Sequence, residues 1–193
     1  MKEEKEITVE VSCTLKELIE ILNKNNFKLK QTYDVNDIYM IDKNYLKEKD
    51  PLKLLNHSLL LRHIILENRE KKLITNKQKI YNDKKEIIKQ SKIDLKVYSI
   101  KEAKDFFETI NYQELIKIND HLLVYANKED ELCIQMVNDK HIYIEIENNC
   151  SFINKVYDNI EEMKKVFKKY NIKIKDNNYF VKKAEIELNE RRK

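Results

Sequence analysis

Polar and hydrophobic residues alternate strictly near the start of the chain. From Glu6 to Cys13 the even-numbered positions are polar and the odd-numbered positions are apolar, which predicts a half-buried strand. Thr14 is a good helix cap, and leucine and isoleucine residues at helical spacing follow it to about Asn25. The chain therefore opens with a predicted strand and a predicted helix.

Similar patterns mark further strands and helices. A second strand is predicted through Tyr33 and Ile41, and the stretch from Asp42 to Asn56, which contains Pro51, is predicted to be a loop. Later strands are predicted at Ser58 to Glu67, Lys72 to Ile80, Lys85 to Gln90, Glu114 to Ala126, Glu131 to Val137 and His141 to Asn148. Helices are predicted after Ser99 and, in the tail, at about Asn154 to Tyr170 and Asn178 to Arg192.

This order of elements predicts an α+β protein, with an antiparallel sheet or closed barrel and helices outside it. No internal linker, repeat or low-complexity block is present, so residues 1–193 are predicted to form a single domain. The chain contains no glycine. Turns are therefore expected at Asn and Asp positions, namely Asn68-Arg69-Glu70, Asn82-Asp83, Asn127 to Asp130 and Asn138-Asp139-Lys140.

Charge and cysteine usage narrow the class of protein. The 38 basic and 34 acidic residues are interleaved, so a nucleic-acid or membrane partner is not expected. No apolar run approaches the roughly 18 residues of a membrane span, and the charged start is not a signal peptide. Cys13, Cys133 and Cys150 lack metal-ligand spacing and suit a reducing compartment. We expect a soluble, cytoplasmic protein.

The last predicted strand carries most of the candidate chemistry. Its isoleucines take one face, and Tyr143, Glu145 and Glu147 take the other. One interpretation is an ordinary sheet with its polar face in water. The other turns the polar face into a closed barrel, where carboxylates would coordinate Mg²⁺ or Mn²⁺ and basic side chains would bind phosphates. Arg62 is notable because it interrupts an apolar run.

A series of short motifs occurs in order along nearly the whole chain. The motifs are Thr8-Val9-Glu10-Val11-Ser12 ahead of Leu18, Asp37-Ile38-Tyr39-Met40, Leu61-Arg62-His63-Ile64, Thr75-Asn76-Lys77, Lys84-Lys85-Glu86-Ile87-Ile88, Lys117-Ile118-Asn119, Tyr143-Ile144-Glu145-Ile146-Glu147 and Asn178-Tyr179. In order and spacing they resemble the motifs of the CYTH family, the class IV adenylyl cyclases and thiamine triphosphatases. That resemblance implies an eight-stranded tunnel that holds a triphosphate and a divalent metal.

The resemblance also implies roles for individual residues. Glu10, Glu86, Glu145 and Glu147 would hold Mg²⁺ or Mn²⁺, whereas Arg62, Lys77 and Lys117 would bind phosphate. Glu10 and Lys77 would be catalytic. The implied ligand is a triphosphate-containing small molecule or nucleotide.

The chain departs from the family at several charged positions. Thr8, Ser12, Ile64, Asn119 and Gln135 stand where the family has acids or bases. Three missing basic contacts, if uncompensated, would cost roughly 5–9 kcal/mol of binding free energy. Three hypotheses therefore stay open: a metal-dependent triphosphate hydrolase, with adenylyl cyclase activity as a variant; a tunnel that binds a nucleotide or polyphosphate without turnover; and an interaction protein that uses the barrel as a scaffold.

Overall fold

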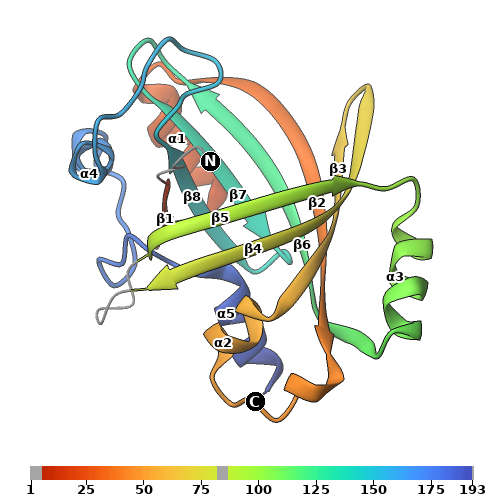
Figure 1. The fold of residues 1–193 in the computed structure, drawn as a ribbon. Helices are drawn as coiled ribbons and strands as arrows, with labels where there is room; N and C mark the ends of the chain where they lie inside the picture. Colours follow the sequence, from red (N-terminus) through yellow and green to blue (C-terminus); the bar gives the residue numbers. More distant parts are fainter. Residues whose placement is uncertain (1–5, 82–86, 193) are drawn as a thin grey trace. The chain divides into compact units, whose positions relative to one another are not determined.

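The structure, a computed structural model, describes residues 6–81 and 87–192, which form one eight-stranded antiparallel sheet and five α-helices (Figure 1). The strands follow the order β1-β8-β7-β6-β2-β3-β4-β5. The α+β class and the eight antiparallel strands are thus confirmed. β1 and β5 end the strand order, so hydrogen bonds among the described residues do not close the sheet.

The elements have the following bounds. The strands are β1 (Glu6–Glu10), β2 (Lys28–Asp42), β3 (Ser58–Leu66), β4 (Arg69–Tyr81), β5 (Ile87–Lys96), β6 (Tyr112–Ala126), β7 (Glu131–Val137) and β8 (His141–Glu147). The helices are α1 (Leu15–Lys24), α2 (Pro51–Asn56), α3 (Ile100–Thr109), α4 (Ile160–Lys169) and α5 (Lys183–Arg191), and η1 (Lys43–Tyr45) is a short 3-10 helix.

The described chain divides into two compact units, which are considered separately below. Unit 1 comprises residues 34–81, 87–119 and 182–192, and unit 2 comprises residues 6–33 and 120–181. The strands β2 and β6 each contribute residues to both units. Unit 1 contains the β3, β4 and β5 strands, and unit 2 contains β1, β7 and β8.

The core of unit 2 lies between the sheet and two helices. β1 and β8 pair with Val9 opposite Ile144, and β7 and β8 pair with Ile134 opposite Ile144, so these apolar side chains share one face. They form one buried cluster with Leu18 of α1 and Phe167 of α4. The apolar face that alternation predicted is therefore the face that the helices cover.

Unit 1 buries its apolar face in the same way. Met40 of β2 and Leu61 of β3 form a core cluster with Ala103 and Phe107 of α3. The α2 and α5 helices, orange and blue in Figure 1, pack against each other elsewhere in the unit. In both units the alternate residues of the strands are left on a second, polar face.

Asparagine and aspartate replace glycine at the backbone positions that need positive φ. Among the described residues, positive φ occurs only at Asn26, Asn111, Asn138, Asp139, Asn171, Asp176 and Asn177. Asn26, Asn111 and Asn171 each follow the C-terminal cap of a helix, where a left-handed residue ends the helix. Asn and Asp enter this region more easily than other non-glycine residues, which explains how a glycine-free chain makes its turns.

Four of the predicted segments differ from the structure for local reasons that can be identified. The expected loop at 42–56 contains η1 and α2, because Asp50 caps a helix that begins at Pro51. The α4 helix begins at Ile160 because the Asn159 side chain accepts a bond from the Glu162 backbone N–H. The α5 helix begins at Lys183, since the residues before it pair with β1. β5 extends to Lys96, beyond the predicted end at Gln90, because it pairs with β4 that far.

A buried carboxylate ties the loop between β6 and β7 to the segments around α4. Asp130 is 1% exposed and accepts four hydrogen bonds: from Lys155 at 2.8 Å, Tyr157 at 2.9 Å, Lys169 at 2.7 Å and Tyr170 at 2.6 Å. Burial alone would raise the pKa of Asp130, but these donors outweigh burial and lower the pKa to about 2. The sequence predicted only a turn here.

We expect Asp130→Asn to lower the free energy of unfolding at pH 7 by about 2 kcal/mol. The pKa is depressed in the folded state from 3.8 to about 2, so the stabilisation is complete above the unfolded pKa and is lost as pH falls from about 4 to about 2. Urea denaturation across this range should show that loss in the parent and a flatter profile in the variant.

The control is Glu161→Gln, which removes an exposed carboxylate that pairs with Lys164 on α4. Exposed pairs contribute little, so this variant should follow the parent at every pH. An Asp130→Asn variant as stable as Glu161→Gln at pH 7 would contradict the structural role of Asp130.

Candidate functional site

The acids of β1 and β8 lie on one face of unit 2. In the β1–β8 ladder Thr8 stands opposite Glu145, and Glu10 stands opposite Tyr143. Directly opposed residues share a face, so Glu10 and Glu145 are diagonal neighbours on the side away from the core. The Thr8 hydroxyl lies 3.5 Å from a Glu145 carboxylate oxygen. Two of the predicted metal ligands are thus brought to the same face.

Much of this polar face is out of contact with water. Tyr143 is fully buried, Gln135 is 2% exposed and Thr8 is 8% exposed. Glu10 keeps 14% of its side chain exposed, whereas Glu147, at the end of β8, is exposed. The interpretation of this face as an ordinary solvated surface is therefore wrong for the described residues near Tyr143.

Tyr33 of β2 reports the electrostatic character of the same face. Burial is the largest effect that raises the pKa of the Tyr33 hydroxyl, and Cys133 and the carboxylates of Glu145 and Glu147 raise it further. Negative charge from β8 therefore reaches Tyr33, and the phenol stays protonated as a hydrogen-bond donor. Local negative charge of this kind favours a bound cation.

The Glu10 carboxylate contacts a histidine and a lysine within unit 2. One Glu10 carboxylate oxygen lies 3.0 Å from the His141 Nδ1 and 3.1 Å from the Lys175 ammonium. His141 is 16% exposed and Lys175 is 50% exposed. The sequence analysis identified Glu10 and assigned no role to His141 or Lys175.

The basic residues of unit 1 also share a polar face. Across the β4–β5 ladder, Thr75 stands opposite Asp94 and Lys77 stands opposite Lys92. Thr75 is fully buried and donates a 2.6 Å hydrogen bond to Asp94. Leu60 of β3 stands opposite Thr75. Arg62 is two positions after Leu60 and so lies on the same face. Arg62 and Lys77, two predicted phosphate ligands, are therefore on one face.

Arg62 is engaged by the acid of a neighbouring motif. Its Nε donates to one oxygen of Asp37 at 2.8 Å, and its Nη2 donates to the other at 2.7 Å. Asp37 is 5% exposed and Arg62 is 24% exposed. Such a bidentate pair is strong and directional, so Arg62 is a structural partner of Asp37 as well as a candidate phosphate ligand.

The electrostatics around Asp94 also reflect a paired charge. Burial acts to raise the pKa of Asp94, but the hydrogen bonds from Thr75 and Lys92 outweigh it, so the pKa is lowered overall. The positive charge of Arg62 contributes in the same direction. Asp94 is therefore ionised at neutral pH and holds Lys92, whose ammonium lies 3.0 Å from it. The sequence analysis did not identify Lys92 as a candidate phosphate ligand, because it predicted that this strand would end at Gln90.

The remaining predicted positions fall elsewhere. Lys117 is 54% exposed, pairs with Glu114 at 3.3 Å and alternates with the buried Ile116 and Ile118. Lys117 therefore points to the side of β6 opposite to that of Ile116 and Ile118. Its role as a phosphate ligand stays a prediction, and this placement does not support it. Glu86 lies outside the described residues.

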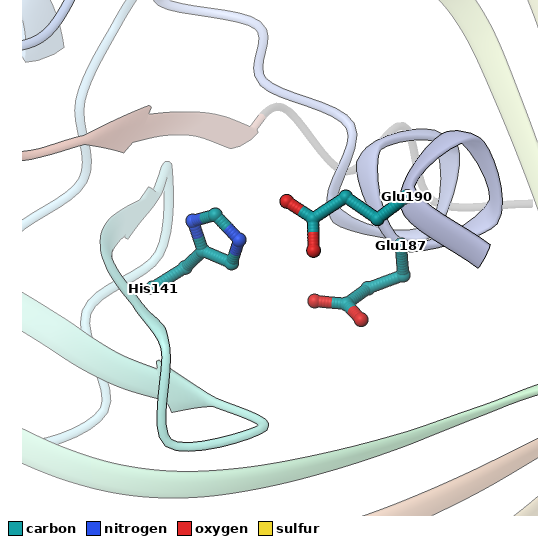
Figure 2. Close-up of side chains that lie close together, drawn as sticks. All are labelled: His141, Glu187 and Glu190. Atoms are coloured by element: carbon teal, nitrogen blue, oxygen red, sulfur yellow. The ribbon is translucent and has the colours of Figure 1, made fainter. Parts of the chain in front are cut away.

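Helix α5 adds two acids to unit 1. Glu187 and Glu190 are three positions apart, which puts them on one side of a helix, and Figure 2 shows both extending from the same side of α5. Glu187 is buried and Glu190 is exposed. His141, also labelled in Figure 2, belongs to β8 of unit 2. The sequence analysis missed this pair because a helix of mixed charge does not indicate which acids are buried.

Comparison with known proteins identifies the fold. No protein-family model matches the chain, and no curated protein matches it in sequence. A conserved hypothetical protein from Pyrococcus furiosus is similar in structure, with a TM-score of 0.64, 17% identity and coverage of 94% of this chain and 98% of that one.

Two further structures of low identity are also similar. One is a candidate adenylyl cyclase from Hippeastrum, described as having a dominant triphosphatase activity, with a TM-score of 0.62, 13% identity and coverage of 98% of this chain and 96% of that one. The other is a chain of the Schizosaccharomyces pombe Mediator head module, with a TM-score of 0.52, 14% identity and coverage of 88% and 92%. This chain shares their fold. A fold found in such different settings does not by itself assign a function.

The described helices were also compared with the requirements of a membrane span. None of them is both long enough and apolar enough to cross a bilayer.

We expect Arg62→Ala to lower the free energy of unfolding by about 3 kcal/mol, because it leaves the buried Asp37 carboxylate without its partner. The double variant Asp37→Asn, Arg62→Ala should lose less, since no unpaired charge remains. Urea denaturation of both variants measures the difference. Equal losses in the single and double variants would contradict the coupling, and Lys71→Ala on exposed β4 is the surface control.

Proposed function

We propose that the chain is a divergent CYTH-like protein that binds an inorganic or organic triphosphate and hydrolyses it in a metal-dependent reaction. We assign phosphate binding to the polar face of unit 1 and metal binding to the polar face of unit 2. The motif order, the shared fold and the triphosphatase activity described for the Hippeastrum protein support this proposal.

The observation that carries the proposal is the direct opposition of Lys77 and Lys92. These two lysines are opposite each other in the β4–β5 ladder, on the same face as Arg62. Like charges directly opposite each other destabilise a sheet. Asp94 offsets part of that charge through Lys92. A polyanion would interact with both lysines, and an extended triphosphate supplies several negative oxygens.

The acids of unit 2 fit a hard divalent cation. Glu145 and Glu10 present carboxylate oxygens on one face, Glu147 follows on the same side of β8, and Mg²⁺ and Mn²⁺ prefer such ligands. In metal-dependent phosphoryl transfer, ions of this kind offset the charge that develops on the phosphoryl group. Glu10 and Lys77 are the residues to which we assign catalytic roles, Glu10 at the metal and Lys77 at the phosphate chain.

A second candidate function is binding without turnover. Asp37 already occupies two donors of Arg62. Ile64 stands where the resembled family has a second arginine, and it follows Arg62 on the same face of β3. Fewer cations are then left to stabilise the charge that develops in the transition state, which lowers the rate of turnover.

The test of phosphate binding is calorimetry with tripolyphosphate on the full chain. We expect binding by the parent and roughly 10-fold to 100-fold weaker binding by Lys77→Ala and by Lys92→Ala, as for loss of a charged hydrogen bond. Lys16→Ala, on exposed α1, is the control with the same charge change and should bind like the parent. Binding by Lys77→Ala equal to that of the control would contradict the assignment to unit 1.

Phosphate release with and without Mn²⁺ separates the hydrolase from the binder. The hydrolase predicts turnover that stops when the metal is removed and in the double variant Glu145→Gln, Glu147→Gln. Binding with no phosphate release under either condition would favour the binder. Absence of both binding and turnover would reject the proposal and favour a scaffold.

A further inference from the structure

The β5 strand of unit 1 stands at one end of the strand order. Among the described residues its ladder partner is β4, from Leu73 opposite Lys96 to Tyr81 opposite Ile87. Figure 1 shows β5 as a long green strand alongside β4. In an edge strand, the backbone N–H and C=O groups that point away from the sheet can pair with a further strand. The β5 edge is therefore a place where another strand can be added.

One face of β5 carries exposed apolar side chains. Ile93 and Leu95 are 63% and 60% exposed, and they alternate along the strand with Lys92 and Asp94 of the polar face. Natural edge strands that remain unpaired are commonly short, bulged or charged. Two large aliphatic side chains on an edge strand are therefore a sign of strand pairing with another chain.

The charges of β5 indicate which strand can pair with it. Lysines on an edge strand commonly prevent pairing, and β5 carries Lys92 and Lys96 on its polar face. Asp94 lies between these two lysines, and its side chain is 34% exposed. A strand with the order base, acid, base is complementary to an antiparallel copy of itself. The complementary partner for β5 is thus a second copy of the same strand.

Two antiparallel registers of such a pair oppose an acid to a base. A two-fold axis through Ile93 places Lys92 opposite the partner's Asp94, and symmetry repeats that pair. It also lets residues 90–96 of the two strands pair with one another. An axis through Leu95 opposes Asp94 to the partner's Lys96 but pairs only residues 94–96 of β5. The register centred on Ile93 therefore combines charge complementarity with the longer ladder.

Shifting the axis by one residue removes that complementarity. An axis through position 92 places two copies of Lys92 opposite each other, and an axis through position 94 does the same with two copies of Asp94. Like charges directly opposite each other destabilise a sheet. The charges of β5 thus fix the register as well as the partner.

We propose that two copies of the chain form a symmetric dimer by pairing their β5 strands in the register centred on Ile93. This inference goes beyond the proposed function and does not depend on it. Ile93 would then lie against the partner's Ile93, where both are removed from water. Asp94 already accepts bonds from Thr75 and Lys92. A carboxylate has about four acceptor sites, so Asp94 can also accept a bond from the partner's Lys92.

Sedimentation velocity of the full chain over a range of concentrations tests for the dimer. An interface of one strand from each copy is at the small end of the range, so the dimer should be weak and should dissociate on dilution. We expect monomer at about 1 μM and a substantial fraction of dimer at about 1 mM. A parent chain that stays monomeric over this whole range would overturn the inference.

An exchange of charges tests the register. Lys92→Asp and Asp94→Lys each place like charges opposite each other in a self-pair, so each variant alone should be monomeric where the parent is a dimer. An equal mixture of the two variants opposes acid to base again and should form a heterodimer. If both variants fold, as judged by circular dichroism, and their mixture stays monomeric, the register is wrong.

Substitutions on the exposed apolar face test the same pairing without altering the polar face. Ile93→Lys places two lysines at the centre of the pair, so this variant should be monomeric. The matched control is Ile65→Lys, which makes the same change at a 37% exposed position of β3, away from the β5 edge. Equal dimerisation by Ile93→Lys and Ile65→Lys would overturn the role of β5.

Disulfide formation gives a second measurement of the register. Opposed residues of an antiparallel pair have Cα atoms about 4.5–5.5 Å apart, within the range of a disulfide, so Ile93→Cys should form a cross-linked dimer on oxidation. Leu95→Cys is the control, because its two copies would be offset by four residues, or about 13 Å. The parent, oxidised in parallel, gives the background from its own cysteines. Cross-linking of Leu95→Cys equal to that of Ile93→Cys would contradict the register.

Discussion

Carboxylates that are buried or nearly buried on the polar faces of the two units constrain the structure, because Asp37 is 5% exposed and Glu10 is 14% exposed. Burying a charge without a partner is costly, whereas a hydrogen-bonded pair is tolerated. Arg62 accordingly donates hydrogen bonds to Asp37. Thr75 donates a hydrogen bond to Asp94, and Lys92 forms an ion pair with it. In the other unit, Glu10 gathers His141 and Lys175 around one carboxylate. These pairs compensate charge on the polar faces, whereas the opposite, apolar faces pack against helices.

The same pairing decides what the site can do. A guanidinium engaged on two edges by Asp37 has fewer donors for a ligand, so the resemblance of its motif to a phosphate-binding motif overstates what Arg62 supplies. Lys77 and Lys92 oppose one another across the ladder. Two positive charges placed together favour an anion, whether or not the protein goes on to hydrolyse it.

Much of the fold was predictable from the sequence because local signals and tertiary structure agree. Alternation at Glu6 to Cys13 and the cap at Thr14 predicted β1 and α1. That Glu10 and Glu145 lie together was implied only by the family resemblance, and the β1–β8 register places them on one face. Asp50 before Pro51 was an available signal for α2 that was not used. Asp130 and Lys175 could not be predicted, since their roles depend on contacts with segments at least 25 residues away.

The most direct measurement of the central claim is lysine labelling followed by mass spectrometry, with and without tripolyphosphate. The account predicts that saturating tripolyphosphate slows acetylation of Lys77 and Lys92 several-fold. Lys16 and Lys165, on the exposed sides of α1 and α4, should react at unchanged rates. Unchanged labelling of Lys77 and Lys92, or equal slowing at all four lysines, would contradict a phosphate site on the polar face of unit 1.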